Sequence, residues 1–288
     1  MVANATVRRI ARAKVNLYLH VRGLRPDGYR ELDSLVVFPA FGDEVELRPA
    51  DTFRLVVDGP FAPALAGLPP EQNLAMKAAI LLLHEVDGAP DFEIRLRKNI
   101  PLGAGLGGGS ADAAAVLLLL NQRLGLGLEL AELRGLGLRL GADVPACLSE
   151  EGVYFAGVGE VIEPAPALPP LHLALVWPGR GLATAEVFRA SRAGAARPRP
   201  SFTAAGLTKF VEVLRDAAND LETAARSLLP AVGEALDALS ARRDCLLARM
   251  SGSGSACFGI FPSAEAAEAA AGDVRRTRPG WWAVSATA

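Results

Sequence analysis

The stretch from residue 101 to residue 110 reads Pro101-Leu102-Gly103-Ala104-Gly105-Leu106-Gly107-Gly108-Gly109-Ser110 and runs directly into an apolar segment. Glycine at this density disfavours a strand or a helix interior, because each glycine loses much backbone entropy on folding. It permits a tight loop whose N–H groups no side chain shields. A helix beginning at Ser110 would add its own unpaired N–H groups and its positive dipole end. These features predict an anion cradle, and the expected anion is a phosphate chain.

Two common phosphate-binding motifs fit this loop only in part. Gly103, Gly105 and Gly108 match the dinucleotide pattern G-x-G-x-x-G, but that pattern requires a buried parallel strand before it. Residues 92–97 alternate instead between apolar and polar types, which is typical of a half-exposed antiparallel strand. The loop also has the spacing of a P-loop, yet Gly109 stands where that motif has its lysine. A glycine-rich connection without a ligand stays open as the alternative.

Composition narrows the class of protein. The chain has 288 residues, 51% of them hydrophobic, and a formal net charge of −2. These values indicate a folded protein of one large domain or two, without the basic charge of a nucleic-acid-binding protein. Three scattered cysteines and three isolated histidines favour neither disulfides nor a histidine metal site. No apolar run is long enough to cross a bilayer, so we expect a cytoplasmic protein.

Hydrophobic periodicity predicts a mixed order of strands and helices. The expected strands are residues 7–21, 31–38, 45–47, 53–57, 92–96, 153–155, 171–177, 256–261 and 281–284. The expected helices are residues 73–86, 110–125, 130–140, 207–214, 220–239 and 264–274. The turn residues at 26–28 predict that the first two strands form a hairpin. Proline-rich stretches at 163–170 and 194–200 are candidates for a seam between two domains.

Two charged residues have both a structural and a catalytic interpretation. Lys14 follows the alternation of the first strand, which predicts that it shares a polar face with Asn16. An ordinary exposed strand lysine is the alternative. Asp143 precedes Val144-Pro145, where a carboxylate either caps a short helix or takes part in catalysis.

Two further stretches are equally open when taken alone. The Ser/Gly run 251–255 is either a linker or a ligand contact, and its position between an apolar stretch and a strand favours the contact. Tyr29 and Arg30 follow the hairpin turn, where an aromatic ring and a guanidinium suit stacking on a planar base. The end of an ordinary hairpin is the alternative.

The order of these features resembles the superfamily of galactokinase, homoserine, mevalonate and phosphomevalonate kinases, the GHMP kinases. That order is a strand with a lysine, a glycine-rich loop opening a helix, Gly-Ala-Asp-Val-Pro at 141–145, and a late Ser/Gly loop. Three more stretches are similar to the members that phosphorylate cytidine diphosphate-linked methylerythritol. They are Ala-Lys-Val-Asn-Leu-Tyr-Leu at 13–19, Asp-Gly-Tyr at 27–29 and Gly-Val-Gly-Glu at 157–160.

The resemblance implies an α+β, two-domain GHMP kinase fold. The N-terminal ATP-binding domain, residues 1–162, would resemble a ribosomal-protein fold, and the C-terminal domain, residues 163–288, would be ferredoxin-like, with the active site between them. It also implies that the γ-phosphate of ATP, assisted by Mg²⁺, passes to the tertiary 2-hydroxyl of the substrate, in the synthesis of isoprenoid precursors. The expected partner is this small-molecule substrate, and no binding to nucleic acid or to a membrane is expected. The protein is expected to be a monomer or a weak homodimer.

The same resemblance implies a set of site residues. Asp143 matches the catalytic base, and Lys14 matches the catalytic lysine close to it. Asn73 and Leu74 match residues that border the nucleoside. The residues that bind the phosphates of ATP would be Pro101, Leu102, Gly103, Ala104, Gly105, Leu106, Gly107, Gly108, Gly109, Ser110 and Ala111. The substrate-binding residues would be Asn16 and Thr184 at the methylerythritol and Tyr29, Arg30 and Phe188 at the cytosine. No metal-binding side chain is assigned.

Arg30 departs from the family pattern, which usually has histidine after Asp-Gly-Tyr. A guanidinium is planar and can stack on cytosine, but it is always charged and offers no acceptor. The mode of base recognition therefore stays open. Two other functions also stay open: another GHMP kinase of the homoserine or mevalonate type, which should lack the Asp-Gly-Tyr turn, and a non-catalytic nucleotide-binding regulator, which should have lost Lys14 or Asp143.

Overall fold

The computed structural model describes residues 5–25, 28, 30–86, 91–191, 197–202 and 206–288, which form two compact units. The first unit comprises Met1–Ala13, Phe41–Leu102 and Gly107–Glu150, and the second comprises Lys14–Ala40, Gly103–Leu106 and Glu151–Ala288. The chain crosses repeatedly from one unit to the other, and the glycine-rich loop itself is divided. Each compact unit is built from three separate stretches of the chain, so the units do not meet at a single boundary. The domain boundary predicted between residues 162 and 163 stays a prediction.

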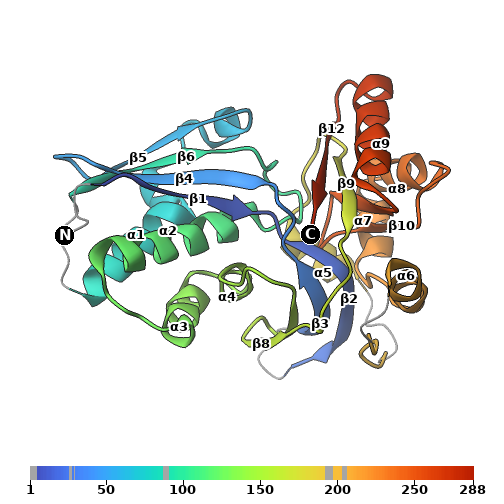
Figure 1. Cartoon of the computed structure of the whole chain (residues 1–288), viewed down its shortest axis with the longest axis horizontal. Coiled ribbons are helices and arrows are strands. Elements are labelled where there is room, and N and C mark those ends of the chain that lie inside the picture. The colour runs from blue at the N-terminus through green and yellow to red at the C-terminus, as the bar shows by residue number, and fades with distance from the viewer. Residues whose placement is uncertain (1–4, 26–27, 29, 87–90, 192–196, 203–205) are drawn as a thin grey trace. The chain divides into compact units, whose positions relative to one another are not determined.

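The first unit is a four-stranded sheet covered by helices (Figure 1). Its strands, in sheet order, are β1 (Val7–Arg12), β4 (Gly42–Pro49), β6 (Phe92–Arg97) and β5 (Arg54–Asp58). Its helices are α1 (Leu74–Glu85), α2 (Gly108–Leu124), α3 (Leu130–Leu140) and α4 (Val144–Cys147), with short 3₁₀ turns at Ala62–Leu65 and Pro70–Gln72. Every second residue of β6 is buried against this helical layer, as the alternation predicted.

The second unit contains two four-stranded antiparallel sheets. One is formed by β2 (Val15–Leu24), β3 (Arg30–Val37), β7 (Val153–Gly157) and β8 (Val161–Pro164). The other is formed by β10 (Leu247–Met250), β11 (Cys257–Phe261), β9 (His172–Trp177) and β12 (Trp282–Thr287). The helices are α5 (Thr184–Ala190), α6 (Leu207–Asp216), α7 (Glu222–Leu228), α8 (Ala231–Ser240) and α9 (Ala264–Thr277).

The single strand predicted at residues 7–21 is wrong. It is two strands, β1 and β2, that belong to different sheets and different units. Between them, the N–H of Ala13 donates to Phe41 in the first unit, and the N–H of Lys14 donates to Leu106 in the second. Hydrophobic alternation does not reveal such a change of partner, because both strands keep the same period. The predicted hairpin is confirmed, since β2 and β3 pair antiparallel.

The predicted alternation of β2 is also broken, by a bulge. The pairing of β2 with β3 shifts between Asn16 and Tyr18, so that Leu17 is an extra residue. Asn16 then bonds to Ser34, whereas Tyr18 bonds to Asp33. Neighbouring residues of one strand point to opposite faces of the sheet. The polar face expected for Lys14 and Asn16 therefore ends at Asn16.

Two helix predictions need correction, and the other predicted elements are confirmed within a few residues. Helix α2 begins at Gly108, two residues before the predicted Ser110, because Gly107 takes the left-handed conformation (φ 66°) at the N-cap. The helix predicted at 220–239 is two helices separated at Leu229 and Pro230. Proline disfavours the helical conformation in the residue before it, and Leu229 is extended (φ −140°, ψ 92°).

The thiols and the helices of the described residues bear on two further features of the sequence. Cys147, Cys245 and Cys257 are all free thiols. In the described ranges, no helix combines the length and the apolar character needed to traverse a bilayer.

Candidate active site

The glycine-rich loop has a regular backbone pattern. Gly103, Gly105 and Gly107 all have positive φ, at 66°, 74° and 66°. Between them, Ala104 and Leu106 bury their side chains almost completely. A loop that alternates in this way is fixed from one side by its small apolar residues, and alternation of left-handed residues gathers successive N–H groups into an anion-binding concavity.

The carbonyl groups of residues 103–106 in this loop all have protein donors. The oxygens of residues 103, 104, 105 and 106 accept, in that order, from the N–H of Leu182 (3.2 Å), the N–H of Ala256 (2.8 Å), the hydroxyl of Ser251 (3.2 Å) and the N–H of Lys14 (2.8 Å). In a trans peptide the C=O and the next N–H point in opposite directions. The N–H groups of residues 104–107 therefore point away from these donors, as a phosphate cradle requires.

Helix α2 continues the cradle within the first unit. Its first hydrogen bond runs from the N–H of Ala111 to Gly107 (2.8 Å), so the N–H groups of Gly108, Gly109 and Ser110 have no acceptor inside the helix. The positive end of the helix dipole lies at the same place. A phosphate bound at the start of α2 would meet these N–H donors.

The Ser/Gly run 251–255 is here named the support loop, and the glycine-rich loop of residues 101–111 is named the phosphate loop. The support loop packs backbone against backbone on the phosphate loop. A Cβ added to Gly105 would lie 2.6 Å from the carbonyl oxygen of Ser251 and 2.7 Å from that of Gly254. A Cβ on Gly252, whose φ is 56°, would lie 2.8 Å from the carbonyl oxygen of Gly105. Neither loop has room for a side chain at this contact. The support loop is therefore no linker, because it is fixed by contacts with the phosphate loop and with residues of β2 and α5.

Lys14 and Asn16 are held by the same two loops. The hydroxyl of Ser251 accepts from the N–H of Asn16 (3.1 Å) and donates to Gly105, so it joins β2 to the phosphate loop. The side chain of Lys14 is 4% exposed, and its Nζ lies 5.3 Å from the centroid of the Phe155 ring. An exposed strand lysine, the structural alternative, is therefore excluded.

Asn16 offers an unused acceptor. Its Nδ2 donates to the hydroxyl of Ser34 (2.8 Å), but its buried Oδ1 finds no hydrogen-bond partner among the described residues. A buried acceptor of this kind costs free energy unless something donates to it. The amide oxygen is thus suited to receive a hydroxyl group of a bound molecule.

Asp143 lies in the first unit, at the N-cap of α4 with Pro145 in the first turn. Its backbone is helical (φ −85°, ψ −16°) rather than extended, and its side chain makes no capping hydrogen bond. An N-cap residue that caps with its carboxylate normally has extended backbone and accepts from the helix. The capping interpretation is therefore not supported.

Asn73 and Leu74 begin helix α1. The side chain of Asn73 caps the helix by accepting from the N–H of Ala75 (2.9 Å). A Cβ at Gly109 would touch Leu74 Cδ1 at 3.5 Å, so Leu74 borders the start of α2. The structure thus brings Leu74 to the phosphate loop and gives Asn73 a capping function.

The structure describes some of the residues that were expected to contact the cytosine. Tyr29 lies outside the described residues. The guanidinium of Arg30 reaches the carbonyls of Phe188 (3.5 Å) and Ser191 (3.4 Å) at the end of α5, where a cation is favourable. At the start of α5, the hydroxyl of Thr184 bonds to Ser253 of the support loop (2.9 Å). Arg30 thus holds the helix that carries Phe188 and Thr184.

Two groups of supporting residues were not found from the sequence. Asn219 donates to the carbonyls of Met250 (2.9 Å) and Gly252 (2.8 Å), and Asp220 accepts from the N–H of Val21 (2.8 Å). Buried Arg249 donates to Leu17 at the β2 bulge (2.7 Å) and to two carbonyls near the end of α6. The available signal was the position of the polar residues Asn219 and Asp220 between two helical stretches, α6 and α7. Their partners lie far away in sequence, so the signal did not reveal what they bind.

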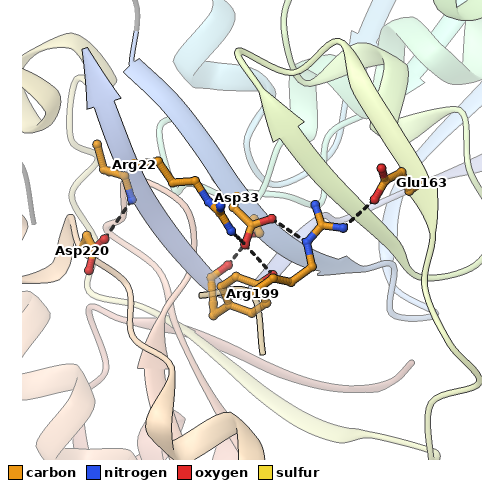
Figure 2. A network of polar contacts seen from close by, with 8 residues as sticks. Arg22, Asp33, Glu163, Arg199 and Asp220 are labelled. Atoms are coloured by element: carbon orange, nitrogen blue, oxygen red, sulfur yellow. Dashed lines mark hydrogen bonds and ion pairs between the residues drawn. The ribbon is translucent and has the colours of Figure 1, made fainter. Parts of the chain in front are cut away.

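Asp33 anchors a separate network on the other face of β3 (Figure 2). Its buried carboxylate accepts from the hydroxyl of Tyr18 (3.0 Å), from Arg22 (3.0 Å) and from Arg199 (2.8 Å), which also pairs with Glu163. Burial, with the Asp33 charge added, raises the pKa of Tyr18 well above its usual value. The network fastens residues 197–202 to the sheet on the face opposite Asn16.

Comparison with known proteins adds independent findings. The sequence profile of the GHMP kinases N terminal domain matches residues 73–151, and that of the GHMP kinases C terminal domain matches residues 205–279. The 4-diphosphocytidyl-2-C-methyl-D-erythritol kinase of Paramagnetospirillum magneticum is 47% identical over 94% of this chain and 95% of its own length. The enzyme of the same name from Rhodospirillum rubrum is 41% identical over 94% of this chain and 89% of its length.

Solved structures agree. A crystal structure of 4-(cytidine 5'-diphospho)-2C-methyl-D-erythritol kinase, 35% identical, superposes with a TM-score of 0.78 over 98% of both chains. Homoserine kinase from Cytophaga hutchinsonii, 20% identical, gives a TM-score of 0.70 over 98% of this chain and 94% of its own, which shows a shared fold only. The predicted α+β GHMP kinase fold is confirmed.

Proposed function

The chain belongs to the 4-diphosphocytidyl-2-C-methyl-D-erythritol kinases of the GHMP kinase family, and from this premise we propose that it phosphorylates the 2-hydroxyl of that substrate with ATP. The observation that carries the proposal is the phosphate loop, in which the carbonyls of residues 103–106 are engaged by the protein while the following N–H groups point the other way. This is the arrangement that phosphoryl transfer requires, because the reaction depends on holding the phosphates and offsetting their charge.

In this proposal residues 101–111 bind the phosphates of ATP, with Leu74 close to the nucleoside end. The loop has no lysine of its own, so Mg²⁺ would supply much of the compensating charge. Among the described residues no group of three or more metal-binding side chains is found. In this proposal the metal is held chiefly by phosphate oxygens and water, as is usual for Mg²⁺ at nucleotide sites.

Asp143 and Lys14 are the proposed catalytic pair. Asp143 would accept the proton of the 2-hydroxyl as the phosphoryl group is transferred, a contribution worth about 10²–10⁴-fold. Lys14 would stabilise the negative charge that develops on the acceptor oxygen and the transferred group. The burial of Lys14 supports its role, and the helical backbone of Asp143 at the start of α4 differs from that of an ordinary capping residue.

The substrate contacts follow from the second unit. The unpaired Oδ1 of Asn16 would accept from a hydroxyl of the methylerythritol part, next to Thr184. Phe188 and Tyr29 would enclose the cytosine. Arg30 would act mainly by holding helix α5, which carries Phe188, rather than by pairing with the base. A cytoplasmic location and a monomer or weak homodimer remain expectations.

The alternatives are less favoured. Homoserine and mevalonate kinases share the fold but are at most 20% identical to this chain in the structures compared, against 41–47% for the named relatives. A non-catalytic regulator is disfavoured because Lys14 and Asp143 are both present.

A coupled assay of ADP release tests the proposal. Diphosphocytidyl-methylerythritol, homoserine and mevalonate would be compared as acceptors, and only the first should support turnover. Activity with one of the other two alone would overturn the assignment of substrate.

Two variants test the catalytic residues in the same assay. Lys14→Ala and Asp143→Ala should each lower kcat by at least about 10²-fold while calorimetry still detects ATP binding. Lys209→Ala, a change at an exposed lysine of α6, is the matched control and should keep normal turnover. A near-normal rate in either test variant would remove that residue from the mechanism.

A further inference from the structure

A buried cluster of one lysine and two carboxylates lies within the first unit. Lys98, which follows β6, donates to Asp43 of β4 and to Asp112 of α2 (2.7 Å to Oδ2). All three side chains are at most 4% exposed. With both carboxylates ionised the cluster would carry one unpaired negative charge in a place that water does not reach, which is costly.

The two carboxylates are not equivalent. Asp43 accepts from Lys98 on one oxygen and from the N–H groups of Asn99 (2.5 Å) and Ile100 (2.8 Å) on the other. Asp112 accepts from Lys98 only, and its buried Oδ1 finds no hydrogen-bond partner in the described part of the chain. Asp43 is thus well supplied with donors as an anion, whereas Asp112 is the carboxyl that a proton would relieve.

The cluster lies directly beneath the cradle. Asp112 is in the second turn of α2, four residues after Gly108. A Cβ on Gly108 would lie 3.4 Å from Oδ2 of Asp43 and 3.1 Å from Ile100. An extra negative charge in this cluster would therefore oppose both the positive end of the helix and any phosphate bound to it.

We propose that Asp112 is a positioning residue of the phosphate loop and that nucleotide phosphates bind tightly only while its carboxyl group keeps a proton. When Asp112 carries this proton, the positive charge of Lys98 balances the negative charge of Asp43, and the cluster has no net charge. The inference rests on the proposed function in one respect only, namely that this loop binds the phosphates of ATP.

The local environment supports a retained proton at neutral pH. Burial, together with the Asp43 charge and against the opposing effect of Lys98, raises the pKa of Asp112 to about 8. Burial alone would lower the pKa of Lys98, but Asp112 and Asp43 outweigh it and raise that pKa. Among the described residues, Lys98 after β6 and Asp43 on β4 are the titratable groups with the largest effect on Asp112.

The test is the pH dependence of ADP binding, measured by calorimetry from about pH 7.5 to about pH 9.5. ADP is suitable because its phosphates lose their last proton near pH 6 and keep a constant charge above about pH 7.5. If the bound form needs the proton, affinity must fall as pH rises through the free-state pKa of Asp112. The wild-type Kd should rise about tenfold over this range, because each unit of pH above that pKa costs up to a factor of ten.

Asp112→Asn imitates the protonated carboxyl. This variant should bind ADP at least as tightly as the wild type at the upper pH, with a change in Kd below about twofold across the range. Asp58→Asn is the matched control, because Asp58 is an exposed aspartate of the same unit and its replacement should leave the wild-type slope unchanged. An Asp112→Asn variant with the wild-type slope would overturn the proposal.

A second measurement needs no variant. Calorimetry of the wild type near the upper pH in two buffers of different ionisation enthalpy reports the protons taken up on binding. Uptake of a fraction of a proton per ADP is expected, and binding without uptake contradicts the proposal while leaving the kinase function intact. Absence of ADP binding at every pH would instead contradict the proposed function itself.

Discussion

The phosphate loop and the support loop are both rich in glycine, yet they dispose of their polar groups in opposite ways. In the phosphate loop the carbonyls of residues 103–106 are all engaged and the N–H groups point away. In the support loop Ser251, Ser253 and Ser255 are buried, and their hydroxyls bond to other parts of the protein. In the proposed function, glycine allows a ligand to approach the first loop, whereas in the second loop it allows close backbone packing. The destination of the polar groups, not glycine density, distinguishes a site from its support.

The largest effect is expected where the two loops touch. Gly105→Ala would force a side chain at φ 74° into the carbonyl oxygens of Ser251 and Gly254, at 2.6 and 2.7 Å. Left-handed strain and overpacking together should lower the free energy of unfolding by about 3 kcal/mol. Nucleotide affinity should fall with it. Denaturant unfolding and calorimetry with an ATP analogue measure the two quantities.

Gly109→Ala is the control for this change. Its Cβ would meet only Leu74, at an ordinary 3.5 Å, and its backbone is helical. Alanine is favoured over glycine in a helix by about 0.5–1 kcal/mol, so this variant should be at least as stable as the wild type. Equal destabilisation by both substitutions would mean that the contact between the loops is not what makes Gly105 necessary.

A smaller effect is expected at the hydroxyl that joins the loops to β2. Ser251→Ala leaves the buried N–H of Asn16 without its acceptor, at a cost of about 1–3 kcal/mol. Because Asn16 and Lys14 lose a fixed position, kcat should fall about tenfold. Steady-state kinetics checks this, with Ser227→Ala, an exposed serine of α7, as the control. An unchanged kcat would show that the support loop does not position β2.

Sequence patterns predicted the features that are local. The glycine-rich turn before α2 and the bounds of α1 and α3 all depend on residues close together in the chain. The bulge at Leu17 was missed because it is fixed by Arg249, which lies 232 residues away. The function of the support loop was missed for the same reason, since Ser251 bonds to Asn16 and Gly105. Partners so distant leave no local pattern.

The smallest effect is expected at Arg30, which touches neither loop. Its guanidinium bonds to α5 at 3.4 and 3.5 Å, long contacts worth no more than about 1 kcal/mol. Arg30→His should therefore raise the KM for the substrate by no more than about fivefold and should still discriminate cytidine from uridine substrates. Kinetics with both substrates checks this. Loss of discrimination would mean that Arg30 reads the base directly.

The most direct test of the account is to compare, by calorimetry, the binding of a non-hydrolysable ATP analogue and of AMP to the wild-type protein. If backbone N–H groups of residues 104–110 hold the phosphate chain, the triphosphate should bind at least about 100-fold more tightly than AMP, because charge-assisted hydrogen bonds contribute about 1.5–3 kcal/mol each. Equal affinities, or no heat of binding with the triphosphate, would contradict the central claim that this loop is a phosphate cradle.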